Sequence, residues 1–159
     1  MHLHAALRGA HAYLAPPATL AGLSPEAAHR LPEGAAHSIT EIVLHLAFWQ
    51  QWFLDRCDGV PTPPPERAEL GWPAVEGASW DAILNRFNEG FERALRLADD
   101  GARASLAIAP ALEFDHLATY TQGDAIMHLA LHNAHHLGQV ITLRQQLGAW
   151  PPPAGRWTW

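Results

Sequence analysis

The stretch from Asp124 to Gly148 constrains this chain most, because its pattern is that of one long helix. Asp124 is an acidic residue that can serve as the N-cap, and Gly148 is the kind of residue that ends helices. Between them, apolar side chains recur at helical spacing and form one stripe: Leu129, Val140, Leu143 and Leu147. The sequence therefore predicts a long amphipathic helix that packs this stripe against a core.

The same helix carries four histidines. His132 and His136 are four residues apart, so they project from one face, one turn apart. Two imidazoles at this spacing can share a metal ion. They lie on the apolar stripe, so we expect them to face the interior, where a polar side chain needs a partner. His135 falls beside the stripe and His128 lies a turn before it, so both are expected to be structural or to line a pocket.

A second helix is predicted from about Ser38 to Cys57. Ser38 stands three residues before Glu41, which is the spacing of a capping box. The apolar stripe of this helix consists of Ile42, Leu46, Trp49 and Phe53. His45 lies within the arc of that stripe, and Glu41 lies one turn before it on nearly the same face.

The remaining segments predict two further long helices and no strands. One helix is expected over residues 2–15, ending before Pro16 and Pro17, which cannot continue it. Ser24 and Pro25 predict a short helical turn, and Ser79 opens a helix that runs to about residue 98. The connection over residues 59–78 is rich in Pro and Gly and is long enough to run back along the second helix. An all-α bundle in one domain, residues 1–159, is the expected fold.

Composition limits the classes of partner. The 159 residues are 48% hydrophobic and 16% charged, with a formal net charge of −6. No cluster of Lys and Arg is present, which argues against nucleic acid and against an anionic membrane surface as partners. The lone cysteine, Cys57, fits a reducing compartment, and no signal peptide or spanning segment is recognisable. We expect a cytoplasmic protein.

His45, His132 and His136 together would supply three nitrogen ligands and leave positions open for water or substrate, as in catalytic metal sites. The alternative is that each is a hydrogen-bonded core residue. A zincin peptidase is excluded because Asn133 stands where its motif needs glutamate. A di-iron bundle needs carboxylates from several helices, and only Glu41 is placed to contribute. Glu41 could accept the outer N–H of His45, be a fourth ligand, or simply cap its helix.

The sequence resembles the DinB/YfiT-like superfamily of damage-inducible proteins over nearly the whole chain. The resemblance rests on three stretches: His37-Ser38-Ile39 with Glu41 and His45-Leu46-Ala47-x-Trp49; His132 to Gln139 followed by Leu143-Arg144; and Gly148 to Pro153 with the Trp157-Thr158-Trp159 ending. It implies a four-helix bundle in up-down-down-up order, with a long crossover between the second and third helices, and frequent homodimers.

The resemblance also implies a divalent metal, often nickel or zinc, on His45, His132 and His136. Members with assigned activities are S-transferases or isomerases that use a low-molecular-weight thiol. We therefore expect a metal-dependent thiol S-transferase acting on a small electrophile. The common basic residue of the last motif is Leu137 here, which leaves the thiol contact at that point open.

Four other side chains are assigned supporting roles. Gln139 and Glu41 are candidates to support the metal ligands without binding the metal, while Trp49 and His128 are candidates to line a pocket, as are Trp52 and the C-terminal tryptophans. Two alternatives stay open: a non-enzymatic metal-binding protein of a stress or damage response, and a hydrolase that uses metal-bound water.

Overall fold

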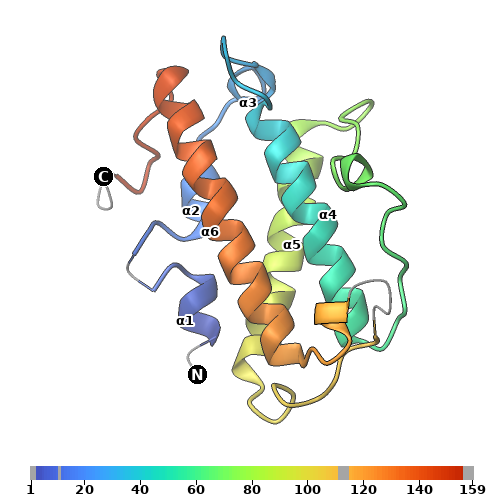
Figure 1. Cartoon of the computed structure of the whole chain (residues 1–159). Helices are drawn as coiled ribbons and strands as arrows, with labels where there is room; N and C mark the ends of the chain where they lie inside the picture. Colours follow the sequence, from blue (N-terminus) through green and yellow to red (C-terminus); the bar gives the residue numbers. More distant parts are fainter. Residues whose placement is uncertain (1–2, 11, 111–114, 156–159) are drawn as a thin grey trace.

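The computed structural model describes residues 3–10, 12–110 and 115–155, and within them the chain is helical (Figure 1). The three long helices are α4 (Ile39–Cys57), α5 (Trp80–Asp99) and α6 (Gln122–Gln146). The short ones are α1 (Leu3–Leu7), α2 (Pro16–Leu20), α3 (Pro25–His29) and the 3-10 helices η1 (Ala68–Gly71) and η2 (Asp115–Leu117). The prediction of an all-α fold is confirmed for this part of the chain. Of the helices described, none combines the length and apolar character needed to cross a bilayer.

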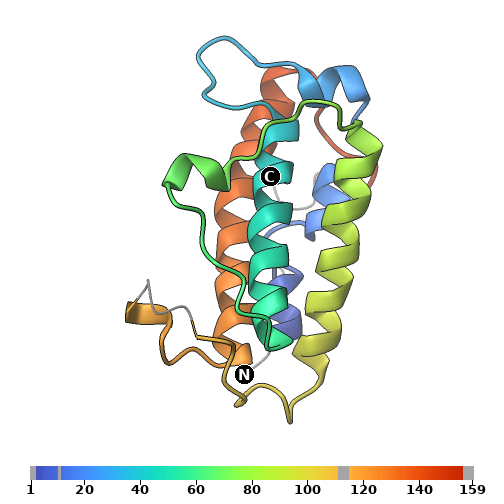
Figure 2. The same cartoon turned by 90° about the vertical axis from the view of Figure 1, so that its right-hand side faces the viewer.

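The long helices pack side by side, and α4 and α5 begin at the same end of the molecule (Figures 1 and 2). The connection over residues 58–79 leaves the end of α4, runs back along its outer side through η1, and leads into α5 (Figure 2). Helix α6 then returns in the opposite direction. This route places the middle of the connection beside the first half of α4, where His45 lies.

The prediction of one long helix over residues 2–15 is wrong. Helix α1 ends at Leu7, and the chain turns at Gly9 and Ala10, whose φ angles of 86° and 46° are left-handed and cannot continue an α-helix. The chain resumes as α2, in which Pro16 occupies the first turn, where a missing N–H costs nothing. Two short helices therefore lie against α6 in place of one long helix (Figure 1).

Both helices that carry the clustered histidines of the sequence analysis, α4 and α6, begin with a capping box. In α4 the predicted box of Ser38 and Glu41 is confirmed. In α6 the N-cap is Thr121, not Asp124 as predicted, and Asp124 accepts hydrogen bonds from the Thr121 backbone N–H (2.9 Å) and hydroxyl (2.7 Å). The threonine was missed because Asp124 is itself a good N-cap residue. At the other end, Gly148 adopts a left-handed φ of 69°, as expected where a helix ends.

The core has two apolar clusters, one at each end of the long helices, and the polar side chain of Gln50 lies at the level between them. Gln50 is 1% exposed and donates to the Phe87 carbonyl across the α4–α5 contact (2.8 Å). It fits because Gly90 has no side chain: a Cβ atom there would overlap the Gln50 amide. Gly90 is therefore needed for the close approach of these two helices.

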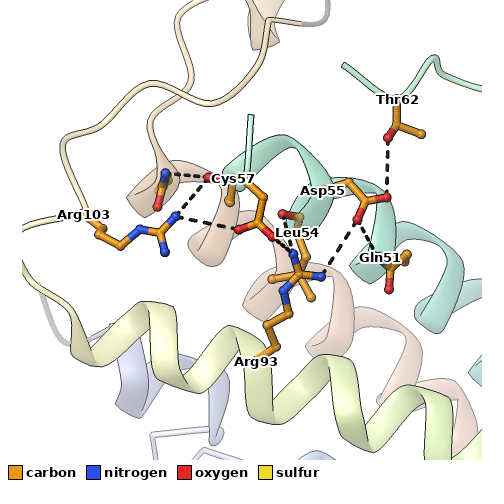
Figure 3. Close-up of polar contacts among 9 residues, drawn as sticks. Gln51, Leu54, Asp55, Cys57, Thr62, Arg93 and Arg103 are labelled. Carbon is orange, nitrogen blue, oxygen red and sulfur yellow. Dashed lines mark hydrogen bonds and ion pairs between the residues drawn. The ribbon is translucent and has the colours of Figure 1, made fainter. Parts of the chain in front are cut away.

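The C-terminal end of α4 is fixed by a network of arginines (Figure 3). Arg93 of α5 donates to the Leu54 carbonyl (3.3 Å) and pairs with Asp58. The Cys57 carbonyl accepts from Arg103 (3.1 Å), and also from Gln122 at the start of α6 (2.8 Å). The donors to Cys57 satisfy a carbonyl at the end of the helix, while the Leu54 carbonyl also accepts the Asp58 backbone N–H (3.2 Å). The network therefore joins α4 to both α5 and α6.

We predict that Gly90→Ala destabilises the protein, although alanine normally favours a helix by about 1 kcal/mol over glycine. The new methyl group displaces Gln50 and breaks its buried hydrogen bond, so we expect a net loss of about 1–2 kcal/mol in the free energy of unfolding, measured by urea titration. The control is Gly138→Ala on α6, where a Cβ atom meets nothing within 4 Å. A gain in stability at both positions would contradict the packing described.

Candidate metal centre

The structure brings together the three histidines singled out from the sequence. His45 comes from α4, and His132 and His136 come from successive turns of α6. Their ligand nitrogens all lie within 4.8 Å of one another, and the Nε2 atoms of His45 and His132 are 3.2 Å apart. His45 and His136 are buried, and His132 is half-buried. The three imidazoles therefore form one cluster between the two helices.

The long connection holds His45 in place. The Nδ1 atom of His45 lies 2.6 Å from the Gly71 carbonyl oxygen, and the ring stacks on the Trp72 indole with 3.9 Å between centroids. Trp72 also stacks on His37, again at 3.9 Å. Gly71 can approach because it lacks a side chain: a Cβ atom there would come within 3.0 Å of the Trp49 ring. Gly71 and Trp72 were missed by sequence analysis, and the only signal was the length of their connection.

Contacts on the ring nitrogens that point away from the cluster determine which nitrogen carries the proton in His45 and His136. A carbonyl oxygen only accepts, so His45 Nδ1 carries the hydrogen that Gly71 receives, and His45 Nε2 keeps its lone pair when the ring is neutral. His136 is held in the same way, with Nδ1 2.8 Å from the Gln139 Oε1 atom. Gln139 therefore contacts the Nδ1 atom of His136. Two lone pairs are directed into the cluster.

Of the three roles considered for Glu41, the structure shows the helix cap and not a contact with His45. The Oε2 atom of Glu41 accepts hydrogen bonds from the Ser38 backbone N–H (2.7 Å) and hydroxyl (2.9 Å). The outer nitrogen of His45 goes to Gly71 instead. Glu41 therefore caps α4 in this structure.

Burial keeps the three imidazoles neutral. Desolvation lowers the pKa of His45 to about 4 and that of His132 to about 3, and it lowers the pKa of His136 as well. The neighbouring histidines lower these pKa values further, because two positive charges in one small space repel each other. Near pH 7 the cluster therefore offers uncharged nitrogen donors, the form in which histidine binds metals.

These donors fit a divalent transition-metal ion. Two nitrogens that share a tetrahedral ion at 2.0–2.1 Å lie about 3.3 Å apart, close to the 3.2 Å between His45 and His132. The separations of up to 4.8 Å would have to shorten, which requires only small movements of the side chains. Three imidazoles without carboxylate or thiolate suit nickel, zinc, copper or iron rather than magnesium or calcium, and they leave coordination positions open.

A pocket of about 420 Å³ lies directly beside His132. Its lining includes His128 together with residues on the first turns of α6 and in the segment before it. Trp49 is not among its lining residues: that ring packs edge-on against His45, with centroids 6.5 Å apart, and against Trp52. A second pocket, of about 320 Å³, lies further along α6 and is lined by residues that include His37 and Gln139. The tryptophans of residues 156–159 lie outside the described residues.

We predict that the metal-free protein loses stability as the pH falls from 6.5 towards 4. An unfolded histidine has a pKa near 6.5 and takes up a proton in this range, while the folded His45 and His132 do not, so acid favours the unfolded chain. Each should cost about 1–2 kcal/mol by pH 5. His132→Gln should reduce this pH dependence in urea titrations at pH 7 and pH 5; an unchanged pH dependence would contradict the buried, neutral state.

One known protein family matches most of the chain. The family model of the DinB superfamily matches residues 15–140, which include all three histidines and the crossover. No curated protein and no solved structure matches the chain significantly. The matched region covers most of the sequence, so this protein belongs to the DinB superfamily.

Proposed function

We propose that this protein binds one divalent metal ion through His45, His132 and His136 and uses it as a thiol S-transferase acting on a small electrophile. The observation that carries the proposal is the set of three neutral imidazoles, two buried and one half-buried, whose ligand nitrogens lie within 4.8 Å of one another. Placing such groups in a core without a ligand is unfavourable. Nickel and zinc are the ions expected.

The chain's own residues hold the site in order and provide access to it. The Gly71 carbonyl and the Gln139 amide oxygen fix two of the imidazoles through their outer nitrogens, an arrangement that orients ligands and strengthens their binding. The pockets beside His132 and beside Gln139 are available to two reactants. A divalent ion, when bound, supplies a Lewis acid that lowers the pKa of a bound thiol.

The reacting thiol must come from outside the protein. Cys57 is 4% exposed and lies at the end of α4, and burial raises its pKa to about 11. A thiol in that state is a poor nucleophile. A low-molecular-weight thiol is therefore the expected co-substrate.

We further propose that α1 and α2 together take the place of the first helix in an up-down-down-up four-helix bundle, and that the protein is a homodimer.

The metal assignment predicts that His132→Ala and His136→Ala each abolish stoichiometric binding of nickel or zinc, measured by elemental analysis after dialysis. The helical circular dichroism should be retained, because α6 keeps its caps and apolar stripe. His135→Ala is the matched control, since His135 is exposed on the same helix and should leave binding intact. Full metal occupancy in both ligand variants would refute the assignment.

The activity predicts metal-dependent consumption of a thiol by a bimane-type electrophile. We expect the rate above the uncatalysed reaction to vanish after chelation and in His132→Ala, and to survive in Cys57→Ser, because the buried cysteine takes no part. Several low-molecular-weight thiols should be assayed. A protein that binds metal but accelerates none of these reactions would favour the metal-binding stress-response alternative over the S-transferase.

A further inference from the structure

One wall of the pocket beside His132 is apolar and exposed to solvent, although the candidate metal site lies close by. The lining residues of the pocket are Tyr120, Asp124, Met127, His128, Leu131 and His132. Leu131 is 65% exposed, the highest value among the large exposed hydrophobic residues described. The volume of about 420 Å³ lies within the range of small-molecule sites. An apolar ligand in this pocket would cover Leu131 and Met127.

Aromatic rings form the inner side of the pocket. The His128 ring lies between that of Phe53, at 4.5 Å between centroids, and that of Tyr120, at 6.2 Å. It is also 6.4 Å from the ring of His132, a candidate metal ligand, so the pocket leads directly to the candidate metal centre. A tyrosine ring attracts a cation placed over its face. The inner side therefore suits a flat or cationic group.

Asp124 gives the pocket a fixed negative charge. It is the one Asp, Glu, Lys or Arg among these lining residues. Hydrogen bonds from the Thr121 backbone and hydroxyl hold the pKa of Asp124 below its usual value, so the carboxylate stays ionised over the whole neutral range. Both of these donors belong to the helix cap, so the carboxylate is held on the first turn of α6.

The start of α6 offers no compensating site for an anion. A helix N-terminus binds anions through its free backbone N–H groups. Here all four are occupied: the N–H groups of residues 122 and 123 donate to the Leu106 and Ala104 carbonyls, and those of residues 124 and 125 donate to the Thr121 hydroxyl and carbonyl. The electrostatic preference at this end of the pocket is therefore for positive charge.

We propose that this pocket binds the electrophilic reactant, and that this reactant is a small apolar molecule carrying a cationic group. Its apolar body lies on Met127 and Leu131. Its positive charge lies towards Asp124 and Tyr120. The role as a reactant rests on the proposed function. The charge preference does not, because it follows from the pocket alone and can be measured without metal.

Binding to the metal-free protein tests the preference with three unreactive probes of similar size: benzyltrimethylammonium, benzyl alcohol and benzenesulfonate. We expect ligand-detected NMR titrations to show binding of the cation about threefold to fivefold tighter than that of the neutral probe, and weaker binding of the anion. Asp124→Asn, which keeps an oxygen acceptor for the cap, should remove the difference between cation and anion.

Two further measurements test the contribution of the apolar wall and that of charge. Leu131→Ser should weaken binding of the cation and the neutral probe by about threefold. Leu31→Ser, at a leucine that is also exposed (53%) but lies outside the pocket lining, should not. In the unmodified protein, raising the salt concentration from about 0.02 M to about 0.5 M should reduce the preference for the cation. Equal affinity for cation and anion at low salt, or no binding of any probe, would overturn the proposal whether or not the protein is an S-transferase.

Discussion

Three neutral imidazoles packed into one small buried space are the constraint on which the rest of this structure depends. A buried polar ring needs a partner for each nitrogen. Here the outer nitrogens of His45 and His136 are satisfied by the Gly71 carbonyl and the Gln139 amide, so their inner nitrogens face each other with lone pairs. The Nε2 atoms of His45 and His132, 3.2 Å apart, are held either by a hydrogen bond from neutral His132 to His45 or by a shared ion. Burial disfavours only the charged form, in which the pair carries an added proton.

The need to satisfy His45 gives the long crossover a structural role. A short hairpin after α4 would have made α5 antiparallel and would have left the outer side of His45 uncovered. The path over residues 58–79 instead carries Gly71 and Trp72 back along α4 (Figure 2), where one supplies the carbonyl and the other covers the ring. The arginine network at the end of α4 (Figure 3) fixes the point from which the crossover starts.

Local pattern was enough to identify the helical core and the three clustered histidines, because helical periodicity determines which side chains share a face. It also placed Gln139 one turn from His136. Local pattern failed where a tertiary contact or a special backbone conformation determines the structure. The turn at Gly9 and Ala10 depends on left-handed residues within an apolar helical pattern. The pairing of Gly71 with His45 spans 26 residues, so no spacing rule could reveal it, and Glu41, closer in sequence, was the more obvious partner.

The most direct test of this account is X-ray absorption spectroscopy of the protein loaded with one equivalent of nickel or zinc. The structure predicts three imidazole nitrogens at about 2.0–2.1 Å from the ion, together with one or two further light atoms at the open positions and no sulfur ligand from the protein. A spectrum with one histidine or none, or with a cysteine sulfur at about 2.3 Å, would show that the ion binds elsewhere and would contradict the central claim.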